Sequence, residues 1–125
     1  MSQDAGYSIK TGALEWIPIA PGINVRIVRR SDETGHFTVV QHSVAGSKLP
    51  RHRHLAPAEL YILKGHGLHP QTGPWGEGDY IYEHMGAIHE AFVFDQEATL
   101  LMISQGPIVR LDTDGSMRGL LIETL

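Results

Sequence analysis

Glycine and proline interrupt this chain so often that long helices have no room. The sequence holds 14 Gly and 7 Pro in 125 residues. The longest stretch without either, residues 87–105, is rich in β-branched and aromatic side chains, which favour strands. Short strands joined by tight turns are therefore expected, and their spacing is typical of an all-β sandwich or barrel.

Seven segments have the composition of strands, and turn-forming sequences such as SDETG and QTGPWGEG separate them. They are residues 23–30, 36–44, 58–65, 79–83, 88–94, 98–104 and 106–111. A chain of this length fits one domain with one core. We therefore expect a single all-β domain over residues 1–125.

Charge and hydropathy exclude several classes of protein. Ten Lys and Arg stand against 14 Asp and Glu, giving a formal net charge of −4, so no nucleic-acid partner is expected. No apolar run approaches the roughly 18 residues that a membrane span needs. The first ten residues lack the order of a signal peptide. The expectation is a cytoplasmic protein without a membrane partner.

The chain has no cysteine, so any bound metal must be held by histidine and carboxylate side chains. It has eight histidines, and six of them fall in one short part of the sequence. These six are His52, His54, His66, His69, His84 and His89.

The segment LPRHRHLAPAELYILKGHG contains the pattern His-x-His. If it is a strand, His52 and His54 point to the same side with Cα atoms roughly 7 Å apart. Glu59 shares a strand face with apolar side chains, where a carboxylate is costly to bury unless it is paired or bound to metal. His89 begins another predicted strand and can join the two histidines.

Two motifs in this region resemble those of the cupin superfamily. The first is matched by Gly46, His52, His54, Glu59 and Gly65, with the last interval one residue short. The second is matched by Gly78, His84, Gly86 and His89. Here His84 replaces the usual proline, and Val93 stands where the family often has asparagine. All four positions of the family's metal ligands are matched.

The resemblance implies a single-domain cupin jelly-roll barrel with an interior site for one divalent metal. The implied ligands, which would also be the catalytic residues, are His52, His54, Glu59 and His89. Imidazole and carboxylate ligands suit Fe2+, which is the expected ion, and they also accept Zn2+, Ni2+ or Mn2+. Glu59 is implied either as a fourth ligand or as a residue behind the ligands.

Within the cupins, the sequence is most similar to small dioxygenases that cleave acetylacetone or 2,4'-dihydroxyacetophenone. This likeness rests on the two motif segments and on SQGPIVRLDTDG near the C-terminus. It implies a non-heme Fe(II) dioxygenase that uses O2 to break a carbon–carbon bond of a β-diketone or hydroxyaryl ketone. It also implies a homodimer, because cupins commonly pair through edge strands.

Two other functions are compatible with the same motifs. One is a metal-dependent isomerase or lyase in which His42 or His84 acts as general base. The other is a non-catalytic sensor that binds a metal or a small ligand. A strict requirement for O2 would exclude the isomerase.

The remaining histidines and aromatic residues receive structural assignments. His66 and His69 lie in a predicted hairpin and are expected at the surface, and His84 is expected at a turn or rim. His42 can line the cavity or face outward. The aromatic residues of the strands are expected in the core. They are Tyr61, Tyr80, Tyr82 and Phe92.

Overall fold

The structure is a computed structural model, and it describes residues 5–123. Its elements are a short 3-10 turn, Thr11–Ala13, and a series of strands. The strands are β1 (Ile17–Ala20), β2 (Ile23–Arg30), β3 (Phe37–Ser43), β4 (Lys48–Leu49), β5 (His52–His54), β6 (Ala58–Lys64), β7 (His66–His69), β8 (Gly73–Gly76), β9 (Tyr80–Glu83), β10 (Ile88–His89), β11 (Phe92–Val93), β12 (Ala98–Ser104), β13 (Ile108–Leu111) and β14 (Met117–Leu120). The prediction of an all-β fold is confirmed.

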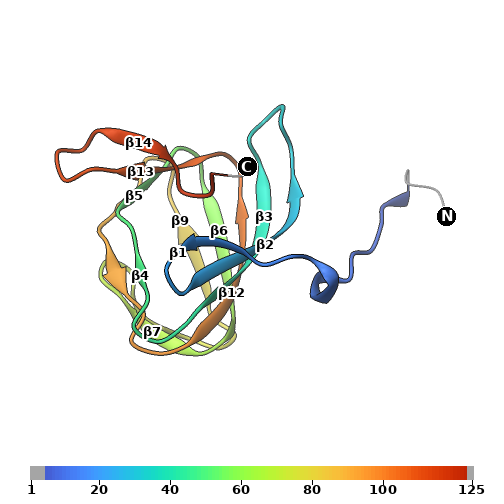
Figure 1. The fold of residues 1–125 in the computed structure, drawn as a ribbon, viewed down its shortest axis with the longest axis horizontal. Coiled ribbons are helices and arrows are strands. Elements are labelled where there is room, and N and C mark those ends of the chain that lie inside the picture. Colours follow the sequence, from blue (N-terminus) through green and yellow to red (C-terminus); the bar gives the residue numbers. More distant parts are fainter. Residues whose placement is uncertain (1–4, 124–125) are drawn as a thin grey trace.

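The strands wrap into a barrel with one large wall and one divided wall (Figure 1). The large wall is a six-stranded antiparallel sheet in the order β1-β2-β3-β12-β6-β9. The opposite wall contains the four-stranded sheet β10-β5-β13-β14 and the short pair β11-β4. Strands β7 and β8 form a separate hairpin. The metal-motif segments are thereby divided between the two walls.

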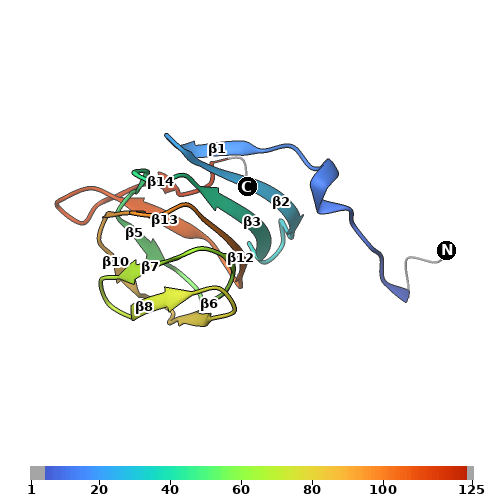
Figure 2. The same ribbon diagram turned by 90° about the horizontal axis from the view of Figure 1, so that it is seen from below.

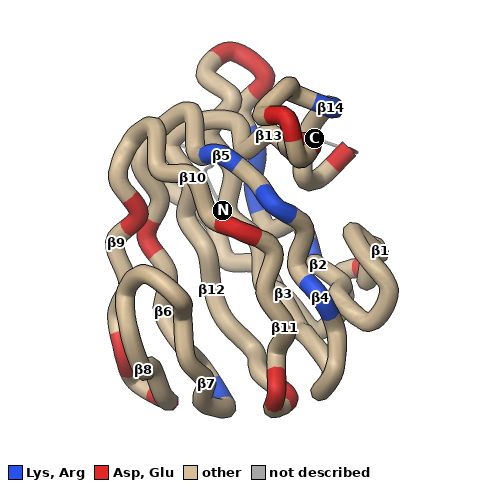
Figure 3. The backbone as a smooth tube through the Cα atoms, turned by 90° about the vertical axis from the view of Figure 1, so that its left-hand side faces the viewer, with Lys and Arg blue, Asp and Glu red and all other residues tan. Residues whose placement is uncertain are grey.

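Alternating burial along the central strands separates the inside of the barrel from the outside. Both β3 and β12 alternate between buried and half-buried residues from end to end, as expected for strands with one face on a core. Neither strand carries a charged residue (Figure 3). Their inward side chains, with those of neighbouring strands, form one hydrophobic cluster.

The predicted strand bounds agree best with the observed ones for long strands in the large sheet. Residues 23–30 and 98–104 are strands over the predicted bounds. The predicted strand 88–94 is instead broken into β10 and β11, which pair with different partners. Because of this break, Phe92 and Phe94 lie on the inner side while Val93 is exposed.

Gly65 ends β6 at the position that the first motif assigns to glycine. Its φ is +91°, a left-handed backbone conformation that other residues rarely adopt. A Cβ at this position would also collide with the backbone oxygen of Glu97. The glycine is therefore required by the backbone of this turn.

The N-terminal segment, residues 5–16, extends away from the barrel (Figures 1 and 2). Its side chains are exposed apart from Leu14, which is half-buried. Trp16 is the point where it meets the body, with the Arg26 guanidinium 4.1 Å from the centre of its ring. Within the described residues, no helix has the length and apolar character to cross a membrane.

Candidate metal centre

Strands β5 and β10 place three histidines next to one another. His52 and His54 are two residues apart on β5, so they share its inner face. His89 lies on β10 directly opposite His52 in the antiparallel ladder. The turn before β10 is tied to β5 because His54 N donates to the carbonyl of Ala87 and Gly86 N donates to that of His54. Backbone pairing therefore fixes all three positions.

The three imidazole rings form a nearly equilateral triangle. Each pair of ring centroids is 5.2 Å apart. All three side chains are buried, and one nitrogen of each lies within 4.8 Å of the other two. Histidine binds transition metals at about 2.0–2.2 Å, so this spacing suits one ion held by all three.

The hydrogen bonds of two rings leave a lone pair directed at the others. Nδ1 of His52 lies 2.8 Å from the carbonyl oxygen of Pro50. Nδ1 of His89 lies 2.6 Å from Oε1 of Gln71. Since these oxygens can only accept, each Nδ1 carries a proton, and in a neutral ring Nε2 then has a free lone pair. That is the tautomer in which Nε2 can bind a metal.

Burial keeps the rings of His52 and His54 neutral. It lowers the pKa of His52 to about 4, although the hydrogen bond to Pro50 opposes the shift. The pKa of His54 is lowered to about 4, by burial first and then by its neighbour His52. Neutral rings at pH 7 can serve as ligands without first losing a proton.

A buried carboxylate, Glu83, completes the cluster. It lies at the end of β9, and with His69 and His89 it forms a second group of candidate ligands that shares His89 with the first. Burial raises the pKa of Glu83, but contact with His89 and the nearby His54 and His69 outweigh it, so the net pKa is lowered. Glu83 is therefore ionised at neutral pH.

The contact between Glu83 and His89 indicates that a cation fits this place. Oε2 of Glu83 lies 2.5 Å from Nε2 of His89, yet Nε2 has no hydrogen-bond partner. A proton on Nε2 would make this contact an ion pair, and a metal ion beside both atoms would bind each of them. In both cases a positive charge beside the ionised Glu83 carboxylate stabilises it. The donor set thus fits a divalent metal.

Glu59, the expected fourth ligand, does not lie with the histidines. Its carboxylate is on the outer face of the large sheet, where it accepts a hydrogen bond of 2.7 Å from the Tyr80 hydroxyl. The inner positions of β6 are Ala58, Leu60 and Ile62 instead. Side chains alternate between the two faces of β6, and Glu59 stands between two inward-facing residues, so its side chain points outward. Glu83 on the neighbouring strand supplies the inner carboxylate.

The prediction for His69 is corrected, and His42 receives a definite place. His69 was expected at the surface, but it is 6% exposed and lines the cavity, because the β7–β8 hairpin folds back over the barrel end. His66 on the same strand is exposed, as predicted. His42 faces outward, with Nε2 2.9 Å from Oε2 of Glu97. His84 lies exposed in the turn after β9, as predicted.

The aromatic residues divide between the two faces of the large sheet. The expectation of core packing is wrong for Tyr61, Tyr80 and Tyr82, which are 46%, 57% and 43% exposed. All three lie on the outer face at the β6–β9 edge, where no further strand covers them. Phe92 is half-buried and packs against the core, as predicted.

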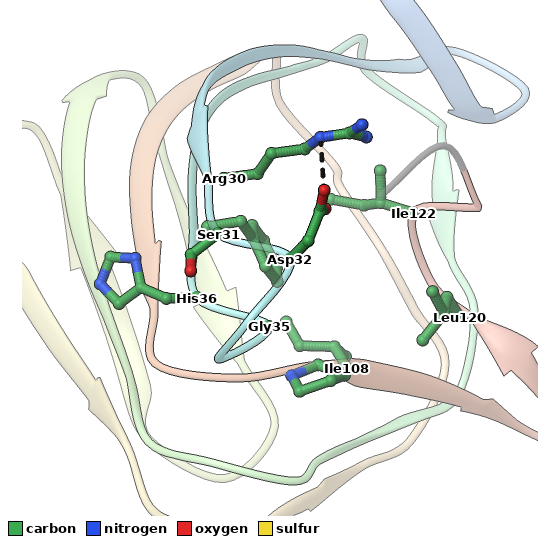
Figure 4. Close-up of a pocket in the computed structure, with 10 residues that line it drawn as sticks. Arg30, Ser31, Asp32, Gly35, His36, Ile108, Leu120 and Ile122 are labelled. Atoms are coloured by element: carbon green, nitrogen blue, oxygen red, sulfur yellow. Dashed lines mark ion pairs between the residues drawn. The ribbon is translucent and has the colours of Figure 1, made fainter.

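The histidines open into a cavity of about 50 Å³ with mainly apolar walls. Glu83 is the carboxylate among its described lining residues, and Leu60, Ile81 and Met102 are among the apolar ones. A larger cavity of about 130 Å³ lies elsewhere, beside the β2–β3 turn (Figure 4). There the charged residues pair with each other, with Arg30 Nε 3.8 Å from Asp32 Oδ1. Neither described group of candidate ligands lies in that larger cavity.

The chain matches a known protein family, and its fold matches a solved structure. A family model described as the ChrR cupin-like domain matches residues 4–109, which include every residue of the cluster. An RmlC-like cupin protein from Ralstonia eutropha has a similar structure, with a TM-score of 0.81 and 17% identity. That alignment covers 99% of this chain and 86% of the other. The fold expected from the sequence, a cupin barrel, is confirmed.

A curated relative is the acetylacetone-cleaving enzyme of Acinetobacter johnsonii. It is 29% identical over 101 residues, which cover 77% of this chain and 66% of the enzyme. The match thus spans just under two thirds of that enzyme's length. The solved structure of an acetylacetone dioxygenase from the same organism has a TM-score of 0.80 at 23% identity, covering 94% of this chain and 86% of the other.

Proposed function

Because the chain belongs to the ChrR cupin-like domain family, we propose that it is a non-heme Fe(II) dioxygenase that cleaves a carbon–carbon bond of a small β-diketone. The observation that carries the proposal is the triangle of three buried histidines, His52, His54 and His89, at an apolar cavity. Its likeness to an acetylacetone-cleaving enzyme supports the reaction class.

In this proposal His52, His54 and His89 hold one metal ion. Three protein ligands on a six-coordinate ion leave positions for a chelating substrate and for O2. A bound Fe2+ would act as a Lewis acid toward the two substrate oxygens and supply the electrons that O2 chemistry needs. Zn2+, Ni2+ and Mn2+ also suit these ligands. The choice of Fe2+ therefore belongs to the proposal and does not follow from the ligands alone.

Glu83 is the residue best placed to take a proton from the substrate. A β-diketone becomes an enolate when the carbon between its two carbonyl groups loses a proton. The Glu83 carboxylate is ionised and lines the cavity, so the proton can pass from that carbon to a Glu83 oxygen. Its place beside His89 keeps this base next to the metal ligands.

The lining of the cavity suits a mainly apolar substrate. The mainly apolar walls suit a short, branched molecule with few polar atoms. We therefore propose the β-diketone as substrate, and O2 as the second small-molecule partner.

The two histidines considered as general base for an isomerase, His42 and His84, lie away from the cavity. His42 lies on the outer face of the sheet beside Glu97, and His84 is exposed in a turn. Neither lines the cavity. A sensor function uses the same metal ligands, so only turnover separates it from an enzyme.

The test is O2 uptake by protein loaded with Fe2+ without air, with one metal per chain confirmed first. The panel holds acetylacetone, larger β-diketones and hydroxyacetophenones. Uptake that needs both iron and a β-diketone, and that is lost in His89→Ala, supports the proposal. Bound iron with no uptake across the panel overturns it and favours the sensor.

We further propose that the protein is a homodimer formed through the outer face of the large sheet. Tyr61, Leu63, Tyr80 and Tyr82 expose between 39% and 57% of their surface there. The protruding segment 5–16 carries exposed apolar side chains of its own, Tyr7 and Ile9. In a two-fold symmetric dimer, the segment 5–16 of each copy can pack on the outer face of the other copy's large sheet. The cytoplasmic location expected from the sequence stays a prediction.

A further inference from the structure

His69 is a buried histidine of the cavity that the proposed reaction has not used. It ends β7, and its ring stands edge-on to His89, with centroids 4.7 Å apart and planes at 90°. Phe92 packs on it at 5.5 Å. These contacts fix the ring beside the candidate metal ligands. What the ring can bind in the cavity depends on which of its two nitrogens carries the hydrogen.

The backbone of the β7–β8 turn decides where the hydrogen lies. Nδ1 of His69 accepts hydrogen bonds from the backbone N–H groups of Gln71, at 3.1 Å, and Thr72, at 3.2 Å. A backbone N–H can only donate, so Nδ1 must offer a lone pair. Nε2 then carries the hydrogen. A ring nitrogen that carries hydrogen has no lone pair for a metal.

Gln71 imposes the opposite state on His89. Its side-chain Nε2 donates to the carbonyl oxygen of Ile88 at 2.9 Å, which fixes the orientation of the amide. Oε1 therefore faces His89 and accepts from Nδ1 at 2.6 Å. Gln71 thus donates to Nδ1 of His69 through its backbone N–H and accepts from Nδ1 of His89 through its side chain.

Among residues 5–123, no group accepts a hydrogen bond from Nε2–H of His69. The nearest carboxylate oxygen that it faces, Oε1 of Glu83, is 4.0 Å away, beyond the range of a hydrogen bond. Both residues line the cavity. An oxygen atom of a bound molecule could accept the hydrogen that Glu83 is too distant to accept.

We propose that His69 binds a substrate oxygen through Nε2–H and is not a metal ligand. The inference rests on the proposed function, and it narrows the substrate to small chelating molecules with a carbonyl or enolate oxygen directed toward β7. A ligand with an apolar group at that point would leave a buried donor unpaired, so the site selects against it.

The first test measures the state of the ring without turnover. Histidine 15N–1H NMR spectra are recorded on the metal-free protein and on protein loaded with Zn2+, with His69→Gln used to assign the signals. The expected result is Nε2–H for His69 in both samples, whereas the Nε2 signals of His52 and His89 move when Zn2+ binds. Loss of the His69 Nε2 hydrogen on Zn2+ binding would overturn the proposal.

The second test measures ligand binding. Zn2+-loaded His69→Leu and His69→Gln are titrated with acetylacetonate, with His66→Leu on the exposed side of the same strand as control. We expect one metal per chain in all three variants. Binding should weaken about 10-fold in the Leu variant, recover in part in the Gln variant, whose amide can donate, and stay unchanged in the control.

The two tests separate this inference from the proposed function. If the wild type binds acetylacetonate and His69→Leu binds it equally well, His69 is not the donor, and the dioxygenase proposal stands. Loss of Zn2+ from both folded His69 variants would make His69 a ligand and overturn the inference. If the wild type binds Zn2+ but no acetylacetonate, the proposed substrate class fails, and the proposal that His69 contacts its oxygen fails with it.

Discussion

Two glutamates on neighbouring strands of the large sheet lie in opposite environments. Glu83 on β9 points into the barrel, is 4% exposed and contacts His89. Glu59 on β6 points outward and bonds with Tyr80. In the ladder, Ala58 stands opposite Glu83 and Glu59 opposite Tyr82. A shift of one residue along either strand would exchange the inner and outer sets, so strand phase decides which carboxylate reaches the histidine cluster.

The largest expected effect is removal of an inner histidine. His89→Ala deletes one of three proposed ligands, and metal affinity should fall by more than about 100-fold. Metal analysis after gel filtration should then find almost no bound ion. His66→Ala, which removes an exposed histidine, should keep the wild-type stoichiometry. Equal metal content in the two variants would contradict the assignment of the inner cluster.

The next effect compares the two glutamates directly. Glu83→Gln keeps the shape of the side chain but removes its charge beside the ligands, so metal affinity should fall about 10–100-fold. Glu59→Gln removes the same charge from the outer face and should leave affinity unchanged. Competition with a chromophoric chelator measures both. A loss in Glu59→Gln as large as that in Glu83→Gln would break the comparison.

Acid should destabilise the metal-free protein through the inner histidines. The folded pKa of His52 and that of His54, each about 4, lie below the unfolded value of 6.5. Above pH 6.5 both states are neutral and stability is complete. As the pH falls toward 4, the unfolded state takes up protons first, so the free energy of unfolding decreases. At pH 5 the loss should be about 2 kcal/mol for each of His52 and His54.

Urea unfolding at pH 7.5 and pH 5 measures this loss. A His54→Asn variant should lose less stability between the two pH values than the wild type does. The outward-facing His42 provides the control, since His42→Asn should keep the wild-type difference. Equal stability of the wild type at both pH values would contradict the burial of neutral histidines.

The smallest effect on the metal site is expected from changes to the outer face. Replacing Tyr61 and Tyr82 by serine should leave metal content unchanged and weaken the proposed dimer, because both side chains are exposed there. Sedimentation velocity over a range of concentrations measures association. Deletion of residues 1–12 should act in the same direction. A dimer unaffected by both changes would place the interface elsewhere.

Several features of the site could be predicted from the sequence. Interruption by glycine and proline indicated an all-β fold, and the two-residue period of strands placed His52 and His54 on one side. His89 followed from the spacing of the second motif, and the structure brings it to the other two. Each of these inferences depends on local geometry, which a short segment fixes by itself.

The tertiary structure decided the rest. Alternation along β6 divides its residues into two sets, but only the barrel shows that Leu60, and not Glu59, faces inward. His69 sits in a sequence typical of an exposed turn, and it is buried because the hairpin folds back onto β10 and Phe92. The tautomers of His69 and His89 depend on Gln71, 18 residues before His89 in the chain. Such contacts arise from packing between distant segments, so local sequence patterns do not encode them.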